Sequence, residues 1–223
     1  MLTYDIDVAG LKRTLPLCHV SDDLYIAAFV IFGDVELTVH SAAELLKLAP
    51  EYDYLIAGIH FLGRWGFDSA ASDWAPLSFE ERCALYERYY RTMKAMAETK
   101  MFNIVAHPDL IKIFSVDDFH RWLDAPGSMD LIGDALSAVR DAGMAMEISS
   151  AGLRKPCREI YPGPKILKLA RNLGLPVTFA SDSHATEQVA WNFDTLARCA
   201  AAEGWKESLV FCRGDVTAMP FVD

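Results

Sequence analysis

The feature that most constrains this chain is a regular alternation of short apolar, β-rich runs with segments of helical periodicity. The alternation extends from about residue 29 to the end of the chain, without a linker or an internal repeat. Strands that are separated by helices pair in parallel through right-handed crossovers. The sequence therefore predicts one α/β unit, built either as an open doubly wound sheet or as a barrel.

The predicted strands are short runs rich in β-branched and aromatic residues. They cover Phe29–Glu36, Tyr52–Ile59, Phe102–Ala106, Met144–Ser149, Pro176–Ser181 and Ser208–Arg213. Helices are expected to begin after three serines that are each followed, three residues later, by an acid: Ser41, Ser78 and Ser115. Two more helices, 130–142 and 164–173, are expected to end before Gly143 and Gly174, because glycine adopts the left-handed conformation found after a helix.

Polar residues that can bind metal or move protons stand at or just beyond the carboxyl ends of five predicted strands. They are Glu36, His60, His107, Glu147 and Asp182. In a barrel such strand ends meet on one face, whereas an open sheet gathers its ligands near one switch point. Their distribution over successive strands therefore favours a barrel with a single pocket.

Three of the six histidines share this context. His60 and His107 follow predicted strands, and His184 closes the run Ser-Asp-Ser-His after another strand. The remaining histidines, in polar connections or inside a helix, are expected to be solvated: His19, His40 and His120. Imidazole together with carboxylate suits Zn²⁺, Mn²⁺ or Fe²⁺, and such ions activate water and neutralise charge on a phosphoryl group. The pattern favours a metal hydrolase, with packed core histidines as the alternative.

Two cations follow the predicted strand Met144–Ser149. Arg154 is a candidate clamp for phosphate oxygens, because a planar guanidinium binds them bidentately, and Lys155 stands beside it. The alternative interpretation is a pair of solvated loop cations. The chain contains no nucleophile elbow G-x-S-x-G, no glycine-rich phosphate loop and no H-E-x-x-H motif.

Composition excludes several other classes of protein. The 21 Lys and Arg against 31 Asp and Glu give a net charge of −10, which disfavours nucleic acid and anionic membranes as partners. The longest apolar run, Leu24–Phe32, is too short to span a bilayer, so a cytoplasmic protein is expected. The five widely spaced cysteines indicate neither a disulfide framework nor a thiolate zinc site.

Four segments of the sequence carry a resemblance to a known family. They are residues 53–61 with 65–68, 106–112, 147–156 with 159–162, and 181–185. The third is the most specific, because its strings G-L-R-K-P and E-I-Y-P are not a generic metal pattern. From about residue 33 onward the chain resembles the PHP-domain phosphoesterases, and among them the histidinol-phosphate phosphatases.

The resemblance implies a distorted (β/α)₇ barrel of the TIM type, over residues 33–223, with one to three divalent ions of zinc, manganese or iron. The metal ligands that it implies are Glu36, His60, His107, Asp182 and His184. Arg154 resembles the arginine that binds the substrate phosphate, with Lys155 as its neighbour, and Asp182, His184 and Arg154 are the implied catalytic residues. The implied reaction hydrolyses L-histidinol phosphate, a small phosphate ester, in histidine biosynthesis.

The resemblance fails at the amino terminus. The family opens with an H-x-H pair and a later S-D-H motif, where this chain has Asp5-Ile6-Asp7 and Ser21-Asp22-Asp23. Residues 1–32 are therefore expected to be a divergent or truncated segment. Missing first strands expose sheet edges, which either this segment or a second subunit of a homo-oligomer is expected to cover.

Three hypotheses follow from these observations. The leading one is a metal-dependent histidinol-phosphatase. The second is a degenerate or truncated relative that binds metal or phosphate without turnover, since the H-x-H pair is missing. The third, a polymerase-associated PHP nuclease, conflicts with the net charge of −10.

Overall fold

The computed structural model describes residues 32–33, 54–63, 65–212 and 215–221. Its centre is a four-stranded sheet in which every neighbouring pair is parallel. In spatial order the strands are β2 (Ile56–Ala57), β5 (Ile104–Val105), β6 (Ala145–Ser149) and β7 (Val177–Ala180). The spatial order follows the chain order, as crossover connections through helices require.

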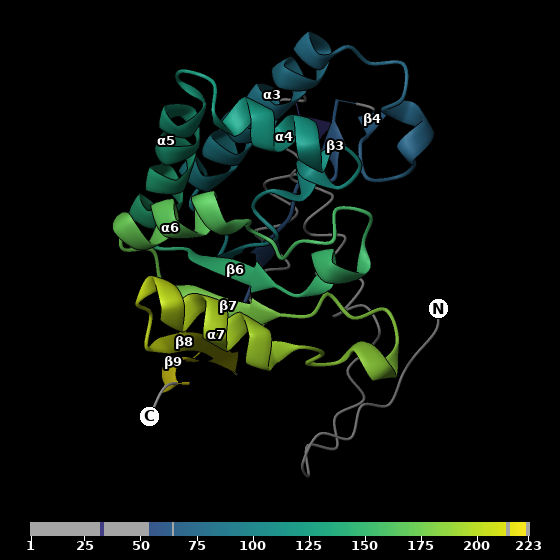
Figure 1. Cartoon of the computed structure of the whole chain (residues 1–223). Helices are drawn as coiled ribbons and strands as arrows, with labels where there is room; N and C mark the ends of the chain where they lie inside the picture. The colour runs from purple at the N-terminus through teal and green to yellow at the C-terminus, as the bar shows by residue number, and fades with distance from the viewer. Residues whose placement is uncertain (1–31, 34–53, 64, 213–214, 222–223) are drawn as a thin grey trace.

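Two smaller sheets flank the central one. In the first, β1 (Phe32–Gly33) pairs in parallel with β3 (Phe61–Leu62), which forms a hairpin with β4 (Trp65–Gly66). The second is an antiparallel hairpin of β8 (Glu207–Cys212) and β9 (Asp215–Pro220), next to β7 (Figure 1).

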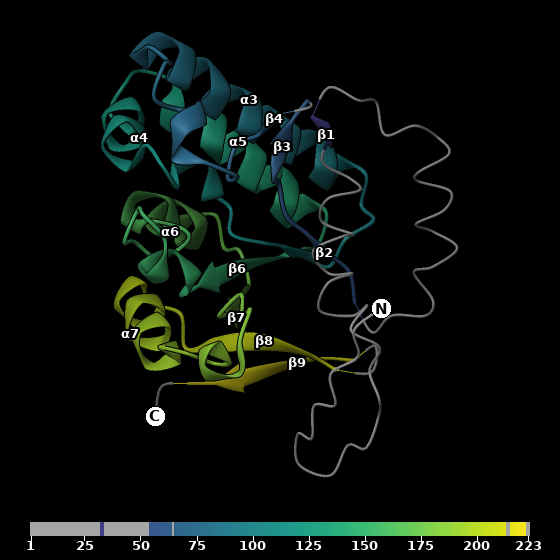
Figure 2. The same ribbon diagram turned by 90° about the vertical axis from the view of Figure 1, so that its right-hand side faces the viewer.

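Five α-helices and several 3-10 turns occupy the connections in the described residues. The helices are α3 (Phe79–Glu98), α4 (Val116–Leu123), α5 (Ser128–Asp141), α6 (Pro164–Asn172) and α7 (Phe193–Glu203). The 3-10 turns are η2 (Ala71–Asp73), η3 (Leu110–Lys112), η4 (Ala151–Arg154) and η5 (Thr186–Gln188). Figure 2 shows α4, α6 and α7 stacked along one side of the strands.

The α/β class and the parallel sheet are confirmed. Each of the six predicted strand regions overlaps a strand, although β1, β2 and β5 have only two residues each. The described strands form three separate sheets, so closure into a barrel stays a prediction. The hairpin β3–β4 and the strand β9 were not predicted. All residues of β9 are exposed, so its sequence lacks the alternation that burial of one face would impose.

The helix signals were mostly correct. Ser78 and Glu81 form a reciprocal capping box at α3, and Gly143 and Gly174 have positive φ after α5 and α6. Ser115 precedes α4 as predicted, but its side chain makes no capping hydrogen bond. Its hydroxyl instead accepts a hydrogen bond of 2.8 Å from the Tyr86 hydroxyl, a tertiary contact that competes with the cap. The predicted helix start at Ser41 lies outside the described residues.

The core is rich in aromatic side chains where α3 and α4 meet. Trp74, Tyr86, Phe119 and Trp122 are all buried, and the ring of Tyr86 contacts the other three in stacked, edge-on and tilted geometries. Burial of such large side chains stabilises this part of the molecule strongly. Among the described residues, no helix is long and apolar enough to cross a membrane.

Candidate active site

Two neighbouring parallel strands bring His60 and His107 together. His60 lies just beyond β2 and His107 just beyond β5, and the two strands pair in register. The imidazole rings lie 4.9 Å apart between centroids, at an interplanar angle of 81°. The sequence prediction that these histidines share one face of the sheet agrees with this geometry.

The two rings converge on the space above Gly58. A Cβ atom built on Gly58 would lie 3.0 Å from Nε2 of His107 and 3.2 Å from Nε2 of His60. Any side chain at this position would therefore fill the space between the two nitrogens. The absence of a side chain leaves both Nε2 atoms bordering one small volume, an arrangement that suits two ligands of one metal ion.

Asp68 orients His60 from the far side. Its Oδ2 lies 2.8 Å from Nδ1 of His60, and both side chains are mostly shielded from solvent. A carboxylate on one ring nitrogen fixes the tautomer and leaves the other nitrogen to bind metal. Asp68 stands in one of the matched segments, but the contact with His60 was not predicted, because it depends on the β3–β4 hairpin.

His107 is buried and held mainly through its backbone. Its N–H donates to Oε1 of Glu147 at 3.3 Å, and its carbonyl accepts from the Tyr89 hydroxyl at 3.1 Å. Burial, followed by the nearby His60, lowers the pKa of His107 to about 4. The imidazole is therefore neutral at pH 7, the form that binds metal, and its buried Nδ1 has no hydrogen-bond partner among the described residues.

Glu147 on β6 adds a buried carboxyl group behind His107. Burial and then the negative charge of Asp182 raise the pKa of Glu147 to about 8, against the hydrogen bonds from His107 and Ser149. The charge of Asp182 also acts on His107, so the two sides of the site are electrostatically linked.

The second group of predicted residues lies after β6 and β7. Nη2 of Arg154, in η4, donates to the carbonyl oxygens of Ser181 at 2.6 Å and Asp182 at 3.0 Å. Nε2 of His184 lies 3.5 Å from Oδ1 of Asp182, and the His184 side chain is 54% exposed. Lys155 ends η4 and is half-buried. The structure thus brings Arg154, Asp182 and His184 together at one edge of the sheet.

The metal ligand set is only partly described. Glu36 lies outside the described residues, so its predicted role as a bridging ligand is not tested. Within the part of the chain that the structure describes, no three His, Cys, Asp or Glu side chains gather closely enough to hold an ion. The convergent Nε2 atoms of His60 and His107 are nevertheless a donor pair that fits a divalent cation.

A buried ion-pair network lies below His107 and was not predicted from the sequence. Lys112 is completely buried, and its Nζ lies 2.7 Å from both Asp109 and Glu159 and 2.9 Å from the Ile160 carbonyl oxygen. Asp109 also accepts a hydrogen bond of 2.7 Å from the Gly163 N–H. The network fastens the loop that follows His107 to residues 159–163.

His120 is less isolated than predicted. It lies in α4, as expected, but its side chain is only 37% exposed, and its Nε2 is 3.3 Å from Oε1 of Glu159. The expected solvated histidine is therefore the outer end of the Lys112 network. The pairing joins residues 39 positions apart (159 minus 120), which local sequence context does not reveal.

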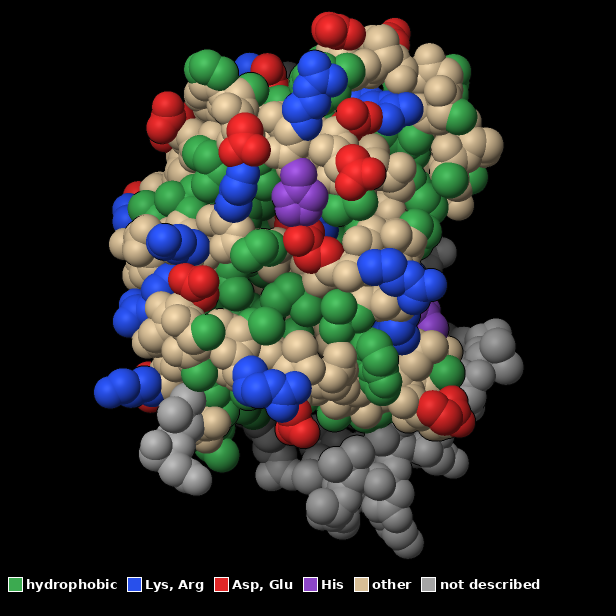
Figure 3. All heavy atoms as spheres, viewed as in Figure 1, with side chains coloured by type: hydrophobic (Ala, Val, Ile, Leu, Met, Phe, Trp, Pro, Cys, Tyr) green, Lys and Arg blue, Asp and Glu red, His purple; other side chains and the backbone are tan. Residues whose placement is uncertain are grey.

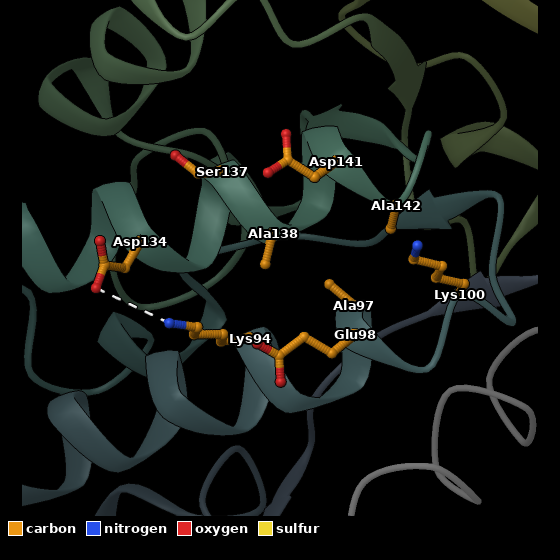
Figure 4. Close-up of a pocket in the computed structure, with 9 residues that line it drawn as sticks. All are labelled: Lys94, Ala97, Glu98, Lys100, Asp134, Ser137, Ala138, Asp141 and Ala142. Carbon is orange, nitrogen blue, oxygen red and sulfur yellow. Dashed lines mark ion pairs between the residues drawn. The ribbon is translucent and has the colours of Figure 1, made fainter.

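A surface groove between α3 and α5 lies apart from these residues (Figure 4). Lys94 and Asp134 face each other across it at 4.0 Å, and Glu98, Lys100 and Asp141 add charges of both signs. Charges of both signs are also interspersed on the face shown in Figure 3. Neither feature offers the concentrated positive charge that nucleic acid requires.

The curated proteins that resemble this chain are all named as histidinol-phosphatases or probable histidinol-phosphatases. The chain is 33% identical over 145 residues to a probable histidinol-phosphatase of Deinococcus radiodurans, covering 64% of this chain and 52% of that protein. It is 29% identical over 220 residues to the histidinol-phosphatase of Bacillus subtilis, covering 88% and 75%. A probable histidinol-phosphatase of Schizosaccharomyces pombe is 24% identical, with 56% of its length covered. The chain thus spans about half the length of the first and third of these. No family model matches it.

Two solved structures share the fold of this chain. The hisK protein of Listeria monocytogenes, described as a histidinol phosphatase, superposes with a TM-score of 0.60 at 25% identity, covering 69% of this chain and 61% of that one. The histidinol phosphate phosphatase of Lactococcus lactis, in complex with zinc, L-histidinol and phosphate, gives 0.59 at 13% identity, covering 80% and 68%. The α/β arrangement is therefore shared with these enzymes.

Proposed function

We propose that this chain is a histidinol-phosphatase of the PHP type, which hydrolyses L-histidinol phosphate to L-histidinol and phosphate, on the basis of its similarity to histidinol-phosphatases. The reaction is a step of histidine biosynthesis, and its substrate is a small phosphate monoester. Support comes from the relatives and from the four matched segments, which contain both histidines and Arg154. The charge of −10 agrees with a small-molecule substrate rather than nucleic acid.

The observation that carries this proposal is the convergence of two imidazole nitrogens over Gly58, with Asp68 behind one of them. We assign His60 and His107 as ligands of one divalent ion of zinc, manganese or iron, completed by Glu36. Asp182 and His184 are assigned to further ions, for a total of one to three. The zinc in the Lactococcus lactis complex supports divalent metal use. Bound divalent ions activate water and neutralise charge on the phosphoryl group.

The remaining residues would bind and orient the substrate. We assign Arg154 as the main phosphate ligand, because its buried Nη1 has no hydrogen-bond partner among the described residues. Lys155 is assigned to the same phosphate as a second cation. Asp182, Arg154 and His184 form the catalytic group, in which His184 either binds metal or donates a proton to the leaving oxygen.

The finer fold assignment is part of the same proposal. Residues 33–223 would form the distorted (β/α)₇ barrel of the PHP domain, with residues 1–32 as a divergent segment outside it. A cytoplasmic location and assembly into a homo-oligomer are the corresponding proposals for the whole protein. The parallel order β2-β5-β6-β7 supports the barrel, since it is the arrangement of successive barrel strands.

The test compares His107→Ala with His120→Ala in the full chain. Metal content is measured after loading with Zn²⁺ or Mn²⁺, and phosphate release is measured with L-histidinol phosphate. We expect His107→Ala to lose metal and turnover, whereas His120→Ala, which removes only a partly exposed contact with Glu159, keeps both. Circular dichroism checks that each variant folds.

Two results would contradict the proposal. Unchanged turnover in His107→Ala would remove the assigned metal site from the reaction. A metal-loaded chain that binds phosphate but releases none from the substrate would instead favour the second hypothesis, a relative that binds without turnover.

A further inference from the structure

Trp191 is a large aromatic side chain to which the proposed function gives no role. It lies between η5 and α7, and 37% of it is exposed. Large aromatic side chains usually bury more of their surface, as Trp74 and Trp122 do in the core of this protein. Packing in the core therefore does not explain the position of Trp191.

The ring of Trp191 lies under the guanidinium group of Arg154. The distance from Cζ of Arg154 to the ring centroid is 5.2 Å, within the range of a cation–π interaction. The same guanidinium also donates hydrogen bonds: its Nη2 donates to the carbonyl oxygens of Ser181 and Asp182. The ring and the two carbonyl oxygens together hold the guanidinium, while Nη1 is left without a hydrogen-bond partner in the described part of the chain.

The backbone around Trp191 is itself fixed to the sheet. The Ser150 hydroxyl donates to the Trp191 carbonyl oxygen at 2.6 Å, and the Trp191 N–H donates to the Gln188 carbonyl oxygen at 3.0 Å. The neighbouring Ala190 N–H donates to the Ser181 hydroxyl at 3.1 Å. Ser150 follows β6 and Ser181 follows β7, so the backbone at Ala190 and Trp191 is anchored to the same two strand ends that carry Arg154 and Asp182.

We propose that Trp191 is a positioning residue that holds the Arg154 guanidinium with Nη1 turned toward the substrate phosphate. The inference rests on the proposed function, since it assumes that Arg154 binds phosphate. The indole face attracts the cation and restricts its rotation, so the free N–H groups are already oriented before phosphate arrives. Trp191 does not touch the reacting atoms in this role, and its effect passes entirely through Arg154.

The test measures binding of inorganic phosphate by calorimetry in the full, metal-loaded chain. We expect Trp191→Ala to weaken phosphate binding about five- to tenfold, the range that corresponds to a cation–π contact. Trp191→Phe, which keeps an aromatic face, should stay within about threefold of the unaltered chain. Steady-state kinetics with the phosphate ester should show a higher KM for Trp191→Ala with little change in kcat.

Three further variants separate positioning from a general structural effect. Arg154→Ala should weaken phosphate binding about 100-fold, and adding Trp191→Ala to it should change nothing more, because the two residues act as a unit. Val189→Ala is the matched control: Val189 is 66% exposed on the same segment, so this variant should bind phosphate like the unaltered chain.

The outcomes distinguish this inference from the proposed function. Weaker binding in Trp191→Ala that is absent in the Arg154→Ala background supports the inference. Normal binding in Trp191→Ala together with a loss in Arg154→Ala overturns the inference and leaves the proposed function intact. An equal loss from Trp191→Ala in both backgrounds also overturns it. Normal binding in Arg154→Ala overturns the assigned role of Arg154, and the role of Trp191 with it.

Discussion

The two sides of the candidate site are built in different ways. On the histidine side, the partly exposed Asp68 lies behind the ring of His60, and the buried Glu147 and Tyr89 bind the backbone of His107. On the phosphate side, Arg154 is held by backbone carbonyl oxygens and by the half-exposed Trp191. His184, on the same side, is more than half exposed.

This difference predicts that substitutions on the two sides will have different effects on folding stability and on ligand binding. Residues on the histidine side belong to the core, so substitutions there should destabilise the fold as well as remove ligands. Residues on the phosphate side, such as His184 and Trp191, are themselves partly exposed, so substitutions there should change binding with little effect on stability. The comparison can be tested with variants that differ only in the side to which they belong.

The largest effect is expected at Lys112, under the loop that follows His107. Lys112→Met leaves the carboxylate of Asp109 buried with only the Gly163 N–H as a partner. Removing one partner of a buried ion pair costs roughly 3–5 kcal/mol. Chemical denaturation of the variant should show a loss of this size in the free energy of unfolding.

The matched control is Lys94→Met in α3. Lys94 is 45% exposed and lies 4.0 Å from Asp134, so its removal should cost less than about 1 kcal/mol. In addition, Asp109→Asn should recover part of the loss in the Lys112→Met background, because it removes the unpaired charge. If Lys112→Met were as stable as Lys94→Met, the histidine side would not depend on buried charge pairs.

A smaller effect, on metal rather than on folding, is expected at Asp68. Asp68→Asn weakens the charge behind His60 and should reduce zinc affinity about 10- to 100-fold, as carboxylates behind metal-bound histidines do. Competition with a chelator of known affinity measures the change. Asp73→Asn, on the exposed turn η2, should leave the affinity unchanged. Equal affinities in the two variants would mean that Asp68 does not support a metal ligand.

Much of the fold and the proximity of His60 to His107 could be predicted from the sequence. The carboxyl ends of parallel strands meet on one face, and this argument placed His60 and His107 together. It needs only the order of strands and helices along the chain. The capping box at Ser78 and the glycines after α5 and α6 were equally local signals. In each case, the physical cause lies within a few residues of the prediction.

The features that sequence did not reveal depend on contacts between distant segments. Lys112 meets Glu159 across 47 positions, and Arg154 meets Trp191 across 37. Ser115 has the sequence context of a cap, yet its hydroxyl is used by Tyr86 from another helix. Such pairings are set by packing, which competes with local preference and leaves no periodic signal in the chain.

The smallest effect on stability is expected at His184. Its side chain is 54% exposed, and its contact with Asp182 at 3.5 Å is a partly exposed pair. His184→Ala should therefore change the free energy of unfolding by no more than about 0.5 kcal/mol, because no buried group loses a partner. Denaturation of the metal-free chain measures this, alongside His107→Ala, which removes a buried ring and should cost several times more. A loss above about 1.5 kcal/mol in His184→Ala would show that this loop stabilises the fold, and the separation between the two sides would fail.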